Sequence, residues 1–349
     1  MSAQWSRTFW AHARERAQRA FGDSFLLNSP QPGTGPAARS HLSATPLKGS
    51  SSASNSGGAP LAVVIVSYNV RRYLAACLAS LTESLGRAGL DARIIVVDNA
   101  SRDGSAEMVR ARFPSVDLIE LDDNVGFARA NNVALRALGF GRAGRTATQL
   151  PEAVWLLNPD TEVEGEAPAI LLRRLREAPR VGAVSPRLRY GDGRFQHAGF
   201  AFPGLAQVVL DLFPVHPRLV ESRLNGRYPR AWYERGHPFR VDMVLGAALM
   251  VRREVIQHVG LLDEGYFMYV EELDWCRRMK QAGWEVEVVP SASVVHYGGQ
   301  STGQYREEMV RALWQSRLRY YRKFSSPAYA ALVRLLVRLG LACRRWRSP

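Results

Sequence analysis

Cysteine is scarce in this chain of 349 residues, which has only Cys77, Cys276 and Cys343. No two of them have the close spacing of a Cys-rich zinc motif, and so few cannot form a framework of disulfide bonds. These absences exclude the small secreted scaffolds that depend on disulfides. They favour a reducing, cytosolic setting.

Long apolar runs are also missing, although 46% of the residues are hydrophobic. No uninterrupted run approaches the roughly 20 apolar residues that a membrane-spanning helix needs, and no early apolar segment resembles a signal peptide. The sequence therefore predicts a globular protein with enough apolar residues for the core of one or two domains.

The middle of the chain has no excess of charge of either sign, although the net charge is +14. Residues 1–60 hold 6 basic and 2 acidic residues, residues 311–349 hold 10 basic residues and no acid, and residues 61–310 hold 30 of each. A balanced body gives no basic groove for nucleic acid, so we expect no nucleic-acid partner. The basic C-terminal end still needs an anionic partner or a solvated surface.

The first half of the body alternates two patterns. Mostly apolar runs typical of buried strands alternate with segments of helical spacing. The strand patterns cover 61–66, 93–97, 116–121 and 153–157, and the helical patterns cover 71–86, 105–112 and 126–138. This order predicts an α/β fold with a parallel, doubly wound sheet and right-handed crossovers.

The remaining segments are less regular. Residues 1–60 are expected to be a flexible N-terminal segment, because 29–60 are rich in Ser, Gly, Pro and Ala, although 4–21 could form a short basic amphipathic helix. The later expectations are short strands or a hairpin over 184–202, a loop-rich insert over 203–240, a helix over 271–282, strands near 285–289 and 293–296, and basic helices over 305–324 and 327–346.

Polar clusters follow the four predicted strands. They are Ser67-Tyr68-Asn69, Asp98-Asn99-Ala100-Ser101, Asn124-Val125-Gly126-Phe127 and Asn158-Pro159-Asp160. Turn chemistry explains any one of them, and Asp160 alone fits a helix-capping turn. Because parallel strands end at one edge, the four together predict a nucleotide pocket. There Asp98 could accept hydrogen bonds from a base, and Asp160 could hold a hard cation against a diphosphate.

These same clusters resemble the motifs of family 2 glycosyltransferases, most closely the rhamnosyltransferase-like branch. The resemblance covers about 61–302 and continues through Gly246-Ala247, Gly260-Leu261-Leu262-Asp263-Glu264, Phe267-Met268-Tyr269-Val270-Glu271-Glu272-Leu273-Asp274-Trp275-Cys276-Arg277 and His296-Tyr297-Gly298-Gly299-Gln300-Ser301-Thr302. It implies a GT-A fold over 61–304, a Rossmann-like doubly wound sheet. It also implies inverting transfer of a sugar from a nucleotide diphosphate.

The resemblance also implies site residues. The predicted nucleotide pocket comprises Ser67, Tyr68, Asn69, Asp98, Asn99, Asn124, Gly126, Phe127 and Asn131, and the predicted sugar or acceptor residues are Gly246, Ala247 and Asp263. Asp160 matches the residue that holds a divalent metal, Mg²⁺ or Mn²⁺. The usual motif is Asp-x-Asp, but this chain has Asn158 at its first position. His296 is a second candidate ligand, and its alternative is a hydrogen-bonded structural histidine.

Inverting transfer needs a base that takes the proton of the acceptor hydroxyl. The resemblance places Glu272 at the position of that base, where the family often has Asp, and Glu271 and Asp274 compete for the role. The alternative is a helix N-terminus enriched in acids, which favour the positive end of the helix dipole. That alternative explains all three acids less well, because close carboxylates repel one another unless something uses them.

The C-terminal helices, 305–349, mix leucines and aromatic residues with basic side chains. This composition predicts a helix on an anionic membrane surface, with packing on the domain as the alternative. The sequence as a whole predicts a cytoplasmic glycosyltransferase, peripheral on the inner face of the plasma membrane. It would move a sugar, rhamnose by resemblance, from a dTDP- or UDP-sugar to a glycan or lipid-linked acceptor in cell-surface polysaccharide synthesis. The alternative function is a non-catalytic protein of the same fold that binds a nucleotide sugar or a membrane surface.

Overall fold

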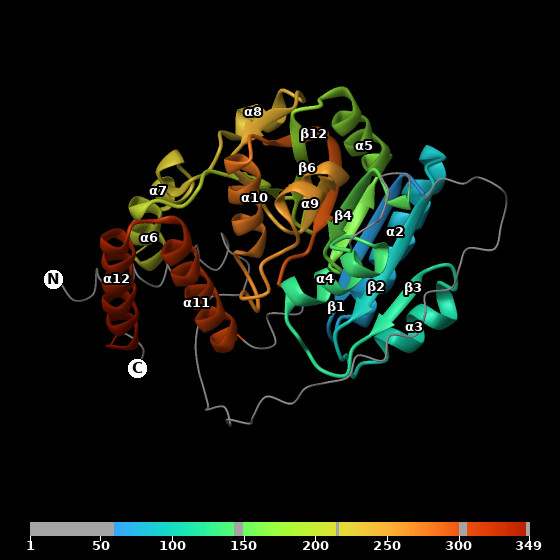
Figure 1. The fold of residues 1–349 in the computed structure, drawn as a ribbon. Helices are drawn as coiled ribbons and strands as arrows, with labels where there is room; N and C mark the ends of the chain where they lie inside the picture. The colour runs from blue at the N-terminus through green and yellow to red at the C-terminus, as the bar shows by residue number, and fades with distance from the viewer. Residues whose placement is uncertain (1–58, 143–148, 214–215, 300–305, 347–349) are drawn as a thin grey trace.

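The computed structural model describes residues 59–142, 149–213, 216–299 and 306–346 (Figure 1). The helix predicted over 4–21 lies outside the described residues. The linker predicted over 29–60 lies outside them too, apart from Ala59 and Pro60.

A single mixed sheet of ten strands forms the centre of the described chain. Its strand order is β3-β2-β1-β4-β11-β6-β12-β5, with β7 beside β6 and β9 beside β12. The bounds are β1 Leu61–Ser67, β2 Ala92–Asp98, β3 Asp117–Glu120, β4 Ala153–Leu157, β5 Thr161–Glu164, β6 Val181–Arg189, β7 Phe195–Gln196, β9 Phe239–Val241, β11 Ala248–Arg252 and β12 Glu285–His296. Because β1 to β4 are mutually parallel, the predicted α/β fold with a mainly parallel sheet is confirmed.

Helices connect and cover these strands. They are α2 Arg71–Ala88, α3 Ser105–Arg112, α4 Phe127–Leu138, α5 Ala167–Glu177, α6 Leu205–Leu212, α7 Pro217–Val220, α8 Arg230–Glu234, α9 Arg253–Val259, α10 Glu271–Gln281, α11 Arg306–Phe324 and α12 Pro327–Trp346. A 3₁₀ turn, η2, covers Arg223–Asn225, and the strands β8 Gly199–Phe200 and β10 Met243–Val244 form a separate pair.

Helix α2 shows how the sequence specifies the first crossover. Its buried residues Leu74, Leu78, Leu81 and Leu85 recur at intervals of three and four residues, which places them on one face of a helix. The helix ends at Gly89, whose φ of 56° is left-handed and whose N–H bonds to the carbonyls of the last turn. This buried face packs against the sheet, and the chain can then return to form β2 beside β1.

Three regions differ from the sequence expectations. The insert over 203–240 is not mainly loop, because it contains α6, α7, η2 and α8. The strands expected near 285–289 and 293–296 are one strand, β12, whose pairing with β6 shifts register between Val289 and Ser293 around Pro290. Proline lacks the N–H that a ladder needs, so it fits such an irregularity. Strand β5 was not expected. Its four residues, Thr161 to Glu164, follow Asp160 directly and run antiparallel to β12.

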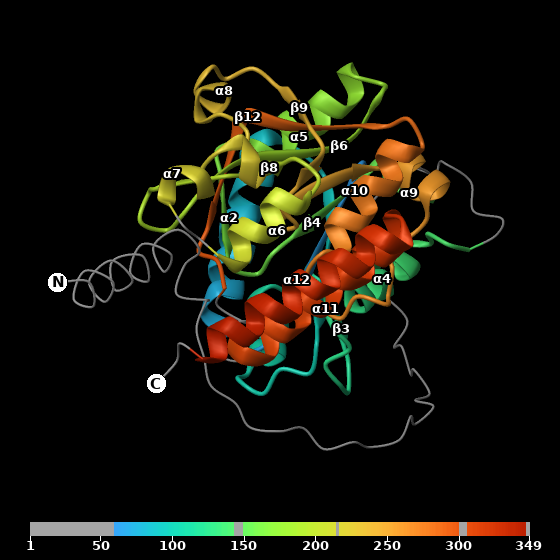
Figure 2. The same cartoon turned by 90° about the vertical axis from the view of Figure 1, so that its left-hand side faces the viewer.

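The predicted basic helices at the C-terminal end are confirmed as α11 and α12. They lie side by side, on the side of the molecule away from β3 and α3 (Figures 1 and 2). Their inward faces form a second hydrophobic cluster with α6 and the start of α10, with Trp314, Tyr321 and Val333 almost fully buried. Within the described residues, no helix combines the length and apolarity required to cross a bilayer.

Candidate active site

The ends of β1 and β2 place two buried polar groups side by side. Ser67 pairs with Asp98 in the parallel register, and both residues are buried. Asp98 accepts a hydrogen bond from the Ser101 backbone at 2.9 Å. Its other carboxylate oxygen and the Ser67 hydroxyl have no partner within the described residues. Burial raises the pKa of Asp98, against the hydrogen bond from Ser101. Buried groups without partners cost free energy, so this pair is a candidate for contact with a ligand.

The loops after β1 and β2 are fastened to each other. Asn69 has a φ of 53°. Its N–H donates to the Ser101 hydroxyl at 3.0 Å, and its side-chain oxygen accepts from the Arg102 backbone at 2.7 Å. Asn tolerates this left-handed conformation better than most residues. Among the predicted pocket residues, Asn69 therefore shapes the loop that surrounds Ser67 and Asp98.

Asn99 and Asn124 join the second and third polar clusters. The Asn99 amide donates to the Asn124 side-chain oxygen at 2.8 Å, and the Asn99 oxygen accepts from the Val125 backbone at 2.9 Å. Asn124 also accepts from Gly126 at 3.0 Å. The structure thus brings the predicted clusters at the ends of β1, β2 and β3 together along one edge of the sheet.

Gly126 lies where this edge contacts the segment before α10. Its φ is 84°, and a Cβ at this position would collide with the carbonyl of Phe267. The next residue, Phe127, donates its N–H to the same carbonyl at 2.8 Å. Glycine is therefore required both for its conformation and for the close approach of two backbones.

The two buried residues Asn131 and Asn132 have different hydrogen-bond partners. The Asn131 amide donates to the Phe127 carbonyl within its own helix at 2.9 Å. Asn132 bonds to the Leu262 carbonyl and to Glu264, each at 2.9 Å. We did not select Asn132 from the sequence. Because Asn is unfavourable inside a helix unless it has another partner, the Asn-Asn pair was a usable signal.

Asp160 and His296 form the candidate metal pair. The antiparallel pairing of β5 with β12 brings them together, and His296 Nε2 lies 3.5 Å from a carboxylate oxygen of Asp160. His296 Nδ1 lies 3.1 Å from the side-chain oxygen of Gln196, which orients the ring. The side-chain oxygen of Asn158 is buried without a partner in the described chain.

This donor set suits a metal that is shared with a substrate. The described residues contain no group of three His, Cys, Asp or Glu side chains placed for a metal, so the protein would supply Asp160 and His296. Magnesium is commonly bound by one or two carboxylates, with substrate phosphates and waters as the other ligands. The pair therefore fits a divalent ion whose coordination a diphosphate completes.

The acids at the start of α10 lie within reach of this edge. Asn158 donates its N–H to the Ala247 carbonyl at 2.9 Å, and Gly246 lies directly against the Glu272 side chain. The predicted sugar or acceptor residues Gly246 and Ala247 thus connect the end of β4 to the predicted base. This chain of contacts joins two motifs that lie more than 100 residues apart in the sequence.

Glu271 and Glu272 each have a carboxylate oxygen that is buried without a partner in the described part of the chain. Burial raises the pKa of Glu271 well above its ordinary value, and the neighbouring charge of Glu272 adds to this. Burial also raises the pKa of Glu272, and a hydrogen bond from the Gly246 backbone opposes the rise. Acids with raised pKa values suit proton transfer near neutral pH.

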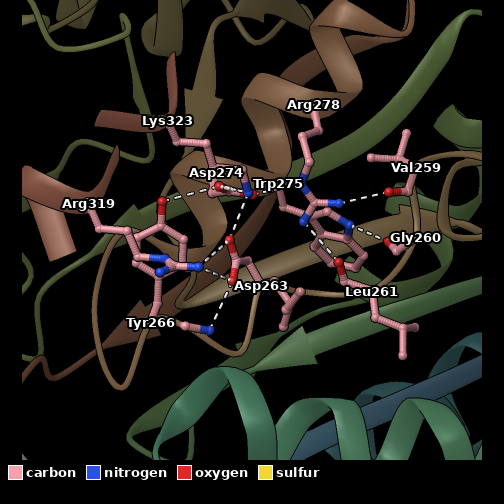
Figure 3. A network of polar contacts seen from close by, with 12 residues as sticks. Val259, Gly260, Leu261, Asp263, Tyr266, Asp274, Trp275, Arg278, Arg319 and Lys323 are labelled. Carbon is pink, nitrogen blue, oxygen red and sulfur yellow. Dashed lines mark hydrogen bonds and ion pairs between the residues drawn. The ribbon is translucent and has the colours of Figure 1, made fainter. Parts of the chain in front are cut away.

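Asp274 and Asp263 have a different environment, which Figure 3 shows. Asp274 is fully buried, and its oxygens accept from Arg278 at 2.6 Å, from Lys323 at 2.6 Å and from the Tyr266 hydroxyl at 3.1 Å. Although burial opposes it, hydrogen bonds from Lys323, the Gly265 backbone and Arg319 lower the pKa of Asp263 to about 2. Both oxygens of each of these carboxylates accept from a donor, whereas Glu271 and Glu272 each keep one oxygen without a partner in the described residues.

Comparison with known proteins finds similarity to glycosyltransferases. The profile "Glycosyl transferase family 2" matches residues 62–200. The chain is 30% identical over 289 residues to the N-acetylglucosaminyl-diphospho-decaprenol L-rhamnosyltransferase of Mycobacterium tuberculosis, covering 81% of this chain and 91% of that protein. It is 25% identical over 237 residues to the dTDP-rhamnosyl transferase RfbF of Shigella flexneri, covering 67% of each.

A solved structure of similar shape is the mannosyltransferase PcManGT from Pyrobaculum calidifontis in complex with GDP-Man and Mn²⁺. It has a TM-score of 0.46 and 18% identity, and the match covers 82% of this chain and 83% of that one. The mycobacterial enzyme is the more informative relative, because its similarity runs through nearly its whole length. The chain with the four polar strand ends and the two adjacent glutamates of α10 is a glycosyltransferase, and it belongs to glycosyltransferase family 2.

Proposed function

We propose that this glycosyltransferase inverts the anomeric centre as it moves a sugar from a nucleoside diphosphate to an acceptor hydroxyl. The observation that carries this proposal is the contact chain from Asn158 through Ala247 and Gly246 to Glu272. It holds Glu272, which has one buried carboxylate oxygen without a partner in the described residues, beside the edge where the sheet would bind a diphosphate. Glu272 and the sugar donor would thus lie on two sides of the position that the acceptor hydroxyl occupies.

In the proposed reaction, the acceptor oxygen attacks the anomeric carbon as the bond from that carbon to the diphosphate breaks. The diphosphate leaves with the bonding electron pair, and Glu272 takes the proton of the acceptor hydroxyl. Burial raises the pKa of Glu272, which brings the base closer to the pH at which it works. Ser67 and Asp98 would contact the nucleoside, since both have polar atoms without a partner in the described residues.

Asp160 and His296 would hold a divalent cation, Mg²⁺ or Mn²⁺, at the diphosphate. When bound, such an ion neutralises charge that develops on the departing diphosphate. With Asn158 in place of a second acid, Asp160 would be the only carboxylate ligand from this motif. His296 is held in place by Gln196, and it would complete the protein's share of the ligands.

The donor we propose is dTDP-rhamnose, and the acceptor is a glycan or lipid-linked sugar of cell-surface polysaccharide synthesis. The names of the mycobacterial and Shigella relatives support this choice. A UDP-sugar is the alternative donor within the same reaction class. The alternative function is a protein of the same fold that binds a nucleotide sugar without transferring it.

A donor panel tests the proposed function. With Mn²⁺ present, dTDP-rhamnose should raise the melting temperature by roughly 5 °C at a concentration 100 times its Kd, because a ligand that binds only the folded state stabilises it by mass action. UDP- and GDP-sugars should raise it less. Free dTDP is the matched control for the sugar's contribution. Rhamnose transfer to a polyprenyl-diphosphate-linked amino sugar should accompany the shift. If binding occurs and no donor supports transfer, the non-catalytic alternative is correct.

We also propose that α12 docks on the cytoplasmic surface of an anionic membrane. Three leucines on one face of α12, Leu332, Leu335 and Leu339, are 43%, 53% and 52% exposed. Arg334 and Arg338 are exposed beside them, and neither makes an ion pair with a described residue. Apolar side chains flanked by arginines suit the boundary between acyl chains and anionic headgroups. The opposite face packs on α6 and α11, so the packing predicted as the alternative also occurs.

Replacing the three α12 leucines by glutamine should weaken binding to vesicles that contain phosphatidylglycerol by at least about tenfold, because less apolar area enters the headgroup region. Co-sedimentation with vesicles measures this. Leu224→Gln is the matched control, since Leu224 is 60% exposed outside α12 and its replacement should leave binding unchanged. Equal binding of the triple variant and the wild-type protein would refute docking through α12.

A further inference from the structure

The backbone immediately before the two glutamates is strained. Tyr269 and Val270 both have positive φ angles, 66° and 75°. A β-branched residue rarely adopts this conformation, because its side chain crowds the backbone. Strain of this kind persists only where the surroundings hold it in place. The first turn of α10, which carries Glu271 and Glu272, therefore depends on contacts made by other parts of the chain.

One face of α11 supplies those contacts. Ser316, Arg319 and Lys323 follow at intervals of three and four residues, so they point in one direction from the helix. The Ser316 hydroxyl donates to the Met268 carbonyl at 2.8 Å, directly before the strained pair. Arg319 donates to Asp263 at 2.9 Å. Together these bonds fix the segment from Asp263 to Val270 against α11.

Lys323 makes the contact that reaches α10 itself. Its ammonium donates to Asp263 at 2.7 Å and to Asp274 at 2.6 Å, so it bridges the loop and the helix (Figure 3). Asp274 is fully buried and lies one helical turn after Glu271. Loss of the ammonium would leave one oxygen of a buried carboxylate with only the Tyr266 hydroxyl as its donor, and such a carboxylate must find another partner or move.

We propose that Lys323 is a positioning residue, which together with Arg319 and Ser316 holds the Tyr269–Glu272 turn in the conformation that presents the base. This inference rests on the proposed function, in which Glu272 removes the acceptor proton. In this proposal Lys323 has no contact of its own with the donor or the acceptor. It acts through Asp263 and Asp274, and it makes the C-terminal helix α11 part of the active-site structure.

The test compares Lys323→Met with Arg317→Met. Arg317 lies on the same helix and forms an ion pair of the same length, 2.6 Å, but its partner is Asp211 on α6. Lys323→Met loses the ion pairs to Asp263 and Asp274, and Arg317→Met loses the ion pair to Asp211, so both variants remove a charge of α11 that is paired with the rest of the fold. Lys323→Met should lower kcat per folded molecule about 10- to 100-fold, the effect expected when a reacting group shifts by about 1 Å. Arg317→Met should keep the wild-type kcat. The donor KM should stay within about twofold in both.

Two further variants separate positioning from general destabilisation. Lys323→Arg keeps the positive charge and should recover part of kcat. Ser316→Ala removes only the bond to Met268, so it should fold normally and show a smaller loss. The inference is overturned if Lys323→Met and Arg317→Met have the same kcat per folded molecule, or if Lys323→Arg recovers nothing.

Amide hydrogen exchange tests the same inference without activity. The amides of residues 269–272 should exchange faster in Lys323→Met than in Arg317→Met, because only the first variant releases this turn. Equal exchange in the two variants would overturn the inference. If the wild-type protein transfers no sugar from any donor, the proposed function fails, and the exchange comparison still decides whether Lys323 holds the turn.

Discussion

Glu272→Gln should lower sugar transfer by about 10²- to 10⁴-fold, the range that a positioned general base contributes. The amide has nearly the same shape as the carboxylate but cannot accept the acceptor's proton. Donor binding, measured by thermal shift, should stay near the wild-type value, because the predicted nucleotide contacts lie at the ends of β1, β2 and β3. The expected result is therefore a protein that binds its donor and does not transfer the sugar.

Glu271→Gln is the matched control. Burial and the charge of Glu272 raise the pKa of Glu271 well above its ordinary value, so we expect Glu271 to be protonated when Glu272 acts as the base. Gln resembles that neutral form, and the variant should keep kcat within about tenfold of the wild type. The reverse pattern, with loss in Glu271→Gln and activity in Glu272→Gln, would assign the base to Glu271. If transfer survives both single substitutions and the double one, neither residue is the base.

The pH dependence of kcat follows from the burial of the Glu272 carboxylate. A base must be ionised to accept a proton, so kcat should rise with pH through the pKa of Glu272, which burial has raised. The folded protein holds a proton at Glu272 more tightly than the unfolded chain does, so this group's contribution to stability falls as pH rises through that range. Glu272→Gln should remove the effect and melt no lower than the wild type. Loss of activity would then not reflect loss of folding.

The sequence predicted the sheet edge well, because the signals there are local. Four mostly apolar runs are followed by polar residues, and parallel pairing brings those ends together whatever the rest of the chain does. The register of Ser67 with Asp98 follows from this pairing. The pairing of Asp160 with His296 was harder to predict from the sequence, since it requires the unexpected strand β5 to lie against β12.

The acids of α10 show where sequence reasoning could not decide. The resemblance favours Glu272, with Glu271 and Asp274 as competitors, but residue type alone does not distinguish the three acids, and their different environments come from other elements. The ammonium that engages Asp274 is 49 residues away in the sequence, on a helix whose orientation depends on the second hydrophobic cluster. The contact that places Glu272 at the site comes from Gly246. Long-range packing therefore separates the structural acid from the two candidates for proton transfer.

Asp160→Asn should lower kcat/KM by at least about 100-fold and abolish the part of nucleotide binding that depends on metal. In the wild type, dTDP should stabilise the protein more with Mn²⁺ than with a chelator. In the variant, the two conditions should give the same melting temperature, because an amide is a much weaker ligand for a hard cation than a carboxylate. The manganese-dependent stabilisation of His296→Gln should lie between that of the wild type and that of Asp160→Asn, since His296→Gln leaves the carboxylate in place.

Asp103→Asn is the control for changing an acid at the same edge. Asp103 follows β2 and accepts from the Arg71 backbone at 2.7 Å and from Ser105, so it fastens a loop and should not affect the response to metal. A variant Asp160→Asn that kept the manganese-dependent shift would show that the carboxylate is not a metal ligand. The contact between Asp160 and His296 would then be structural. Because Asn158 cannot replace the lost charge, the motif has no second acid to mask the result.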